Sequence, residues 1–167
     1  MPARPDRPRA IAVVGGTRVA RPVQDAAAEV GRLLAEAGAV VVTGGREGVA
    51  TAVCRGAAEA GGTTVGILPG RSREKANPWV TIPIPTGMGD TRNALVVMGA
   101  DAVIAFPGAF GTLSEIAHAA VAGTPVVAMT GAWELSRDGQ PDDTILRVGT
   151  PKDAVALALA VAGDDGG

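Results

Sequence analysis

The sequence has 167 residues, a length that fits one domain. Hydrophobic residues make up 47% of it and aromatic residues only 2%, so a sizeable core is available and must be built from Ala, Val, Leu and Ile. The formal net charge of −2 supplies no basic field, which argues against a nucleic-acid partner, and the single Cys and single His leave no Cys-rich or His-rich metal site. We therefore expect a protein that needs no metal and no cofactor for its activity.

The chain begins with a segment, residues 1–9, that is rich in Pro and Arg and is predicted to be a disordered tail. This segment lacks the apolar core of a signal peptide. No run in the sequence reaches the roughly 18 apolar residues that a membrane span needs. We therefore expect a cytoplasmic protein with no membrane partner.

Short runs of Val, Ile and Ala alternate with helical patterns from residue 10 onward, which indicates βαβ units. The runs predict strands at residues 10–14, 39–42, 64–68, 80–84, 101–106 and 126–129. The 3.6-residue periodicity and the flanking Gly and Pro residues predict helices at about residues 21–37, 48–60, 90–99, 113–122 and 152–162.

Two further features complete this assignment. Pro83 and Pro85 interrupt the hydrogen-bond ladder of the fourth strand, so that strand is expected at an edge or as an irregular segment. Residues 133–148 are predicted to be loop and short irregular structure, and residues 163–167 a second disordered tail. The sequence thus predicts an α/β fold, a three-layer Rossmann-like doubly wound and mostly parallel sheet, in one nucleotide-binding domain over residues 10–162.

Three of the predicted strands end in glycine-rich turns ahead of helices. The carboxyl ends of parallel strands meet at one edge of the sheet, where helix N-termini present unpaired N–H groups suited to phosphate. Glycine lets the backbone approach an anion closely. The turns supply the candidate contacts for a phosphorylated ligand, which are Gly15, Gly16, Thr17, Gly44, Gly45, Gly108, Ala109, Phe110, Gly111 and Thr112.

Two common nucleotide signatures are missing. The sequence contains no Gly-Lys pair, so the Walker motif is absent. The turn at residues 15–20 lacks the third glycine of the dinucleotide fingerprint, and the second strand ends in Thr43 and Gly44 instead of an acidic residue that would hold a ribose diol. ATP hydrolysis and NAD binding are therefore disfavoured.

The segment PGAFGTLSE, residues 107–115, carries the most specific pattern. Thr112 and the neighbouring amides are placed to hold a phosphate, and Glu115, in the first turn of the predicted helix, is placed to reach the sugar attached to it. A structural alternative is open: Thr112 caps the helix, and the carboxylate of Glu115 pairs with the helix dipole.

This segment resembles the PGGxGTxxE signature of the LONELY GUY phosphoribohydrolases. The wider chain, through VTGGREGVATAVCRGAAEAGG, ILPG, ANPWVTIPIPTGMGDTRN and ADAVIAFPGAFGTLSEIAHA, is still more similar to a bacterial sister group that includes the molybdenum-cofactor carrier proteins. The resemblance covers residues 11 to about 133. It implies a Rossmann-like fold and a homodimer or higher homo-oligomer.

The resemblance also assigns site residues. Glu115 matches the glutamate that closes the signature, and Arg92 matches the upstream arginine that completes the hydrolase site, so both are the candidate catalytic residues. Three features depart from the hydrolases. Ala109 replaces the second glycine of the phosphate loop, and Asn93, a further candidate ligand contact, stands where a lysine is common. Thr43, Gly44 and Gly45 stand where the hydrolases have a run of three glycines.

Two functions follow from these assignments. The first is hydrolysis of the N-glycosidic bond of a nucleoside 5′-monophosphate, which releases the base and ribose 5-phosphate; retention of Arg92 and Glu115 favours it. The alternative is a non-catalytic binding or carrier protein for molybdenum cofactor, a phosphorylated pterin, or for a nucleotide; Ala109 and the wider resemblance favour it. The sequence leaves open whether Trp79 and Trp133 line the ligand site or an oligomer interface.

Overall fold

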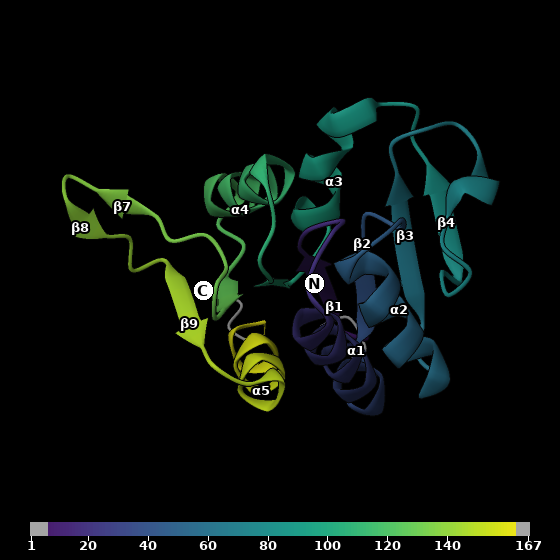
Figure 1. Cartoon of the computed structure of the whole chain (residues 1–167), viewed down its shortest axis with the longest axis horizontal. Helices are drawn as coiled ribbons and strands as arrows, with labels where there is room; N and C mark the ends of the chain where they lie inside the picture. The colour runs from purple at the N-terminus through teal and green to yellow at the C-terminus, as the bar shows by residue number, and fades with distance from the viewer. Residues whose placement is uncertain (1–6, 163–167) are drawn as a thin grey trace, which may run out of the picture.

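The computed structural model describes residues 7–162 of the chain, which form a parallel β-sheet with helices on both faces (Figure 1). Seven strands lie in the order β4-β3-β2-β1-β5-β6-β9, and every neighbouring pair is parallel. The doubly wound Rossmann-like sheet expected from the sequence is confirmed. The strands of this sheet are β1 (Ala10–Val14), β2 (Val40–Thr43), β3 (Thr64–Leu68), β4 (Ile82–Pro85), β5 (Ala102–Ala105), β6 (Val126–Met129) and β9 (Ile145–Val148).

The helices divide between the two faces of the sheet. One face is covered by α1 (Arg21–Glu36), α2 (Val49–Glu59) and α5 (Pro151–Val161), and the other by α3 (Asn93–Met98) and α4 (Phe110–Ala122) (Figure 1). Two short 3₁₀ helices, η1 (Arg73–Lys75) and η2 (Gly89–Arg92), lie before and after β4. A hairpin of β7 (Ser136–Arg137) and β8 (Gln140–Pro141) projects from the body of the molecule between β6 and β9 (Figure 1).

The central strands are buried on both faces, which explains their unbroken apolar sequences. In β1, Ile11 and Val13 pack into the cluster beneath α1, α2 and α5, whereas Ala12 and Val14 pack into the cluster beneath α3 and α4. This alternation follows from the two-residue period of a strand. The apolar runs therefore fix both halves of the core.

Glycines allow α1 and α2 to pack closely on their shared face of the sheet. A Cβ atom on Gly56 of α2 would lie 1.9 Å from the carbonyl oxygen of Ala28, and one on Gly31 of α1 would lie 2.0 Å from the carbonyl oxygen of Val53. Real Cβ atoms do not approach oxygen this closely, so the interhelical distance depends on these two glycines.

The structure differs from the sequence-based assignment in two places. Helix α4 begins at Phe110, three residues before the predicted start, because Ala109 takes an extended conformation and acts as the N-cap residue. The predicted loop at 133–148 contains a seventh strand, β9, which pairs with β6. The edge position expected for the Pro-containing strand is confirmed, since β4 pairs only with β3.

The two predicted tails lie almost wholly outside the described residues. Of residues 1–9, only 7–9 are described, and the guanidinium of Arg9 donates a hydrogen bond of 2.6 Å to the carbonyl oxygen of Ala162. Arg7 pairs with the carboxylate of Asp101. Between residues 7 and 162, no helix is long and apolar enough to cross a membrane.

Candidate functional site

The glycine turns that follow β1 and β5 meet at the middle of the sheet. The strand order reverses direction there, since β1 lies between β2 and β5, and ligands of open α/β sheets bind at such a point, beyond the carboxyl ends of the strands. The amide of Gly16 donates a hydrogen bond of 2.8 Å to the carbonyl oxygen of Pro107, which joins the two turns. A Cβ atom on Gly108 would lie 2.9 Å from the Gly16 nitrogen, so this junction requires glycine.

Helix α4 opens directly from the second of these turns and has no side-chain cap. The first N–H groups of a helix lack intrahelical acceptors and carry partial positive charge, which makes an uncapped N-terminus an anion site. Thr112 is buried and does not cap the helix; its hydroxyl oxygen would lie 2.1 Å from a Cβ atom on Gly108. The capping alternative for Thr112 is therefore wrong. Ala109 has a φ of −93°, which any residue adopts, so alanine does not strain the loop.

A cleft of about 630 Å³ lies in front of this N-terminus. It brings together residues from the β1 turn, the segment before α3, and the first two turns of α4. The predicted site residues that line it are Gly15, Gly16, Thr17, Arg92, Asn93, Ala109, Phe110, Gly111, Thr112 and Glu115. Asp90, Ser114 and His118 complete the lining.

The remaining predicted glycines lie around this cleft. Gly44 lines a deeper hollow of about 70 Å³, which shares Arg92 and Glu115 with the cleft. Gly108 lines a third hollow, on the side of the turn that faces the start of α1. Gly45 lines none of these three; its amide donates a hydrogen bond of 2.9 Å to the hydroxyl of Thr43, and this contact holds the turn after β2 in place.

Arg92 and Glu115 come from different elements and converge in the cleft. Arg92 ends η2 and Glu115 lies in the second turn of α4, one turn later than expected from the sequence. The Nη1 atom of Arg92 lies 3.8 Å from Oε1 of Glu115, and their side chains are 14% and 9% exposed. The Nε atom of Arg92 is buried and has no hydrogen-bond partner within residues 7–162. The guanidinium also lies over Gly44, where a Cβ atom would be 2.5 Å from Nη1, so a side chain at this position would displace the guanidinium.

Burial shifts the pKa of both groups toward the neutral form. Burial raises the pKa of Glu115 to about 7, although the nearby Arg92 guanidinium acts in the opposite direction. Burial also lowers the pKa of Arg92, opposed by Glu115 and Asp90 and assisted by the guanidinium of Arg46. An arginine remains protonated after a modest reduction. At neutral pH the cleft therefore holds a full positive charge beside a carboxyl group that is only partly ionised, and this imbalance favours an anionic ligand.

Asn93 has a structural role in addition to lining the cleft. Its amide nitrogen donates a hydrogen bond of 3.0 Å to the hydroxyl of Ser114, which in turn donates one of 2.7 Å to the carbonyl oxygen of Gly111. These contacts tie the start of α3 to the first turn of α4. They fix the position of Arg92, the residue immediately before Asn93, relative to the phosphate turn.

Sequence reasoning missed Arg46 and Ser114. Arg46 lines the deeper hollow and lies close enough to Arg92 to affect its pKa. Its signal in the sequence is its position directly after the glycine pair that follows β2. Ser114 carries no such signal, because its role depends on contact with α3.

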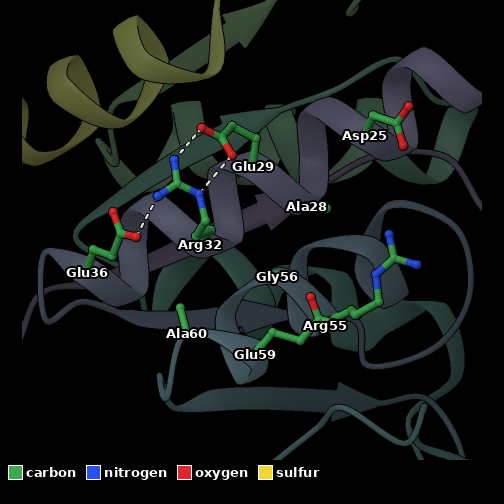
Figure 2. Close-up of a pocket in the computed structure, with 9 residues that line it drawn as sticks. All are labelled: Asp25, Ala28, Glu29, Arg32, Glu36, Arg55, Gly56, Glu59 and Ala60. Atoms are coloured by element: carbon green, nitrogen blue, oxygen red, sulfur yellow. Dashed lines mark hydrogen bonds and ion pairs between the residues drawn. The ribbon is translucent and has the colours of Figure 1, made fainter.

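A separate hollow of about 570 Å³ lies on the outer face of α1 and α2 (Figure 2). Figure 2 shows the guanidinium of Arg32 between the carboxylates of Glu29 and Glu36. The shortest N–O distance to each carboxylate is 2.5 Å. None of the predicted site residues lines this hollow. The ion pairs among the α1 residues that line it lie on an exposed helix face, and such pairs contribute little to stability or binding.

Comparison with known proteins identifies relatives of the whole domain. Residues 8–155 match the SLOG cluster4 family. An uncharacterized protein of Archaeoglobus fulgidus is 40% identical over 119 residues, which cover 71% of this chain and 78% of that protein. The structure is similar to the molybdenum cofactor binding protein of Rippkaea orientalis, with a TM-score of 0.82 and 30% identity over 93% of this chain and 98% of that chain. It is also similar to the molybdenum cofactor carrier protein of Chlamydomonas reinhardtii, with a TM-score of 0.78 and 29% identity over the same shares of the two chains.

The family match and the two structural similarities confirm the resemblance that was inferred from the sequence motifs, both to the LONELY GUY-like superfamily and to the molybdenum-cofactor carriers within it. The match covers the turn after β2, the Arg92 segment and the signature at the start of α4. The chain belongs to the SLOG cluster4 family.

Proposed function

We propose that the cleft binds the phosphate of a small molecule that carries a heterocyclic ring, and that the protein is a carrier for such a ligand, of the molybdenum-cofactor type. The observation that carries this proposal is the convergence of the uncapped N-terminus of α4 and the guanidinium of Arg92 on one cleft. Backbone amides and a bulky planar cation are the groups that proteins use to hold phosphate.

The electrostatics of the cleft support an anionic ligand. The carboxyl of Glu115, with a pKa of about 7, neutralises the Arg92 guanidinium only in part near pH 7, and Arg46 adds a second guanidinium close by. A bound phosphate would compensate this excess of positive charge. It would also accept a hydrogen bond from the Nε atom of Arg92 if the side chain adjusted, because that atom has no partner among the described residues.

The relatives support a carrier over an enzyme. The proteins of Rippkaea orientalis and Chlamydomonas reinhardtii, which bind and carry molybdenum cofactor respectively, align with 93% of this chain. A carrier needs tight binding without turnover, which agrees with the binding and carrying named for these two relatives.

Native mass spectrometry of the freshly purified protein tests the proposal. We expect one of two results. Either a species with the mass of a phosphorylated pterin is already bound, or the protein binds added inorganic phosphate and ribose 5-phosphate. We expect Arg92→Ala to weaken the binding of these added probes about tenfold. The matched control is Arg55→Ala, at the separate α1–α2 hollow, which leaves binding unchanged. Absence of any bound species together with absence of phosphate binding would refute the proposal.

A second function, phosphoribohydrolysis, is favoured by one observation: Arg92 and Glu115 share the cleft, with 3.8 Å between them. In that reaction the carboxylate of Glu115 would orient the ribose hydroxyls or the attacking water and stabilise positive charge on the sugar. The test is release of ribose 5-phosphate from AMP and GMP, measured beside the double variant Arg92→Ala, Glu115→Gln. Release equal to that of the variant excludes this function.

We also propose that the chain acts in the cytoplasm as a homodimer or higher homo-oligomer. Ile82 and Ile84 of the edge strand β4 are exposed, as is Met98 of α3. The two isoleucines lie beside Val65 and Ile67 of β3, which contribute to the apolar cluster under α3 and α4. Burial of such apolar side chains against a second copy would be favourable. Light scattering of the parent chain and of Ile84→Asp tests this proposal. A monomeric parent chain would refute the oligomer, and an oligomer that Ile84→Asp leaves intact would show that this face is not the interface.

A further inference from the structure

An exposed aromatic side chain stands at the rim of the phosphate cleft. Phe110 is the first residue of α4 and lines the cleft, yet it is 78% exposed. Burial of a phenyl ring normally stabilises a folded chain, and at 78% exposure Phe110 contributes little of that stabilisation. Its neighbours in the cleft are polar or small, and most of the ring surface is open to water.

A second aromatic residue holds this ring in place from the side. The rings of Phe110 and Trp133 lie with centroids 5.7 Å apart and planes inclined by 34°. The indole Nε1 of Trp133 donates a hydrogen bond of 3.1 Å to the carbonyl oxygen of Ala109, the N-cap residue of α4. The indole is thereby fixed to the phosphate turn itself. Because Trp133 follows β6, two neighbouring strands of the sheet build this pair.

The placement is notable in a chain with so few aromatic residues. The sequence contains two Trp, two Phe and no Tyr. Phe106 is buried in the core, whereas Phe110 and Trp133 lie together at the cleft. An aromatic pair of this geometry gains about 1 kcal/mol from its own contact, which does not account for leaving the Phe110 face open to water.

We propose that Phe110, positioned by Trp133, is the specificity-determining residue of the cleft, and that its ring stacks on the planar heterocycle of the ligand. This inference rests on the proposed phosphate site. Phe110 offers its backbone amide at the N-terminus of α4 and its side chain to the ring, so the ligand must carry its heterocycle close to its phosphate. Nucleoside monophosphates and phosphorylated pterins meet that condition, whereas a phosphosugar without a base does not.

The buried carboxyl group in the same cleft is consistent with this orientation. Glu115 is nine-tenths buried, pairs with Arg92, and lies one turn along α4 from the amides that would hold the phosphate. The middle of the ligand, between phosphate and ring, would face Glu115 and Arg92. In this orientation the α4 amides bind the phosphate, Arg92 and Glu115 contact the middle of the ligand, and the Phe110 ring stacks on the heterocycle.

Calorimetric titration of the full chain with two probes tests the inference. GMP carries a phosphate and a purine whose 2-amino-4-oxopyrimidine portion matches that of a pterin; ribose 5-phosphate carries the phosphate without the ring. We expect Phe110→Ala to weaken GMP binding about tenfold, which corresponds to about 1.4 kcal/mol, and to change ribose 5-phosphate binding less than twofold. Phe110→Trp should retain GMP binding, and Trp133→Phe should weaken GMP alone, by about threefold, through loss of the bond to Ala109.

Val121→Ala is the matched control, since Val121 is 89% exposed on the same helix but far from the cleft. If GMP binds no more tightly than ribose 5-phosphate, or if Phe110→Ala weakens both equally, the stacking role is refuted while the phosphate site stands. If neither probe binds the parent chain, the proposed function falls and this inference with it. A change of oligomeric state in Phe110→Ala with unchanged GMP affinity would assign the ring to a subunit interface and overturn the proposal.

Discussion

Replacement of Glu115 by Gln should change the pH dependence of stability in a calculable way. Burial holds the pKa of Glu115 at about 7 in the folded chain, against an ordinary value of 4.5. The folded state therefore keeps this proton over a pH range in which the unfolded chain has released it. The free energy of unfolding should decrease as the pH rises from about 4.5 to about 7. At higher pH the carboxyl is ionised in both states, and the folded chain stays less stable by a constant amount.

The magnitude follows from the two pKa values. One pKa unit corresponds to about 1.4 kcal/mol, so ionising the buried carboxyl costs about 3 kcal/mol above pH 8. Glutamine has nearly the shape of the protonated acid and does not ionise. The difference in unfolding free energy, Glu115→Gln minus parent, should therefore increase by about 3 kcal/mol between about pH 4.5 and pH 8.5.

Urea unfolding followed by circular dichroism over this pH range measures that difference. A constant offset, such as a change in side-chain packing, does not affect the result, because only the change with pH is compared; the attraction of ionised Glu115 to Arg92 is already included in its pKa of about 7. Glu59→Gln, at an exposed position on α2, is the control and should run parallel to the parent. Parallel curves for Glu115→Gln would refute the burial argument and remove the basis for a half-protonated group in the cleft.

Three further substitutions have defined outcomes. Gly56→Ala should destabilise the chain by about 3 kcal/mol or more in urea unfolding, because the new Cβ atom meets an α1 carbonyl oxygen, whereas Gly70→Ala, with open space around it, should change stability by less than about 0.5 kcal/mol. Gly108→Ala should abolish phosphate binding in calorimetry, since its Cβ atom would collide with Thr112; unchanged affinity would show that the turn is not the anion site. Arg46→Ala should weaken phosphate binding about fivefold in low salt and much less in high salt, and equal losses in both would contradict an electrostatic role.

Much of the fold could be predicted because its signals are local. An apolar run such as Ile11 to Val14 must be buried on both faces, and the glycine and proline positions mark where each element stops. Gly38, directly after the predicted end of the first helix, has a φ of +74°, a conformation that favours glycine. The strand β9 was missed because Arg147 interrupts its apolar pattern and the preceding residues are polar; pairing with β6 stabilises it there.

The phosphate turn and Glu115 were identified from the glycine pattern, and Arg92 from motif resemblance. The separation of these residues in the sequence says nothing about their distance in space. They meet because the sheet order places β1 beside β5, and because the Asn93–Ser114 hydrogen bond joins α3 to α4. Contacts of this kind depend on strand order and helix packing, which no local pattern encodes.

The sequence by itself thus determined the elements, the glycine turns and the chemical groups available. Only the tertiary structure decided that Phe110 stands open beside Trp133, that Arg46 approaches Arg92, and that Glu115 is buried deeply enough to raise its pKa to about 7. The physical reason is that exposure, desolvation and the distance between charges are properties of the packed chain, whereas propensity and periodicity are properties of short segments.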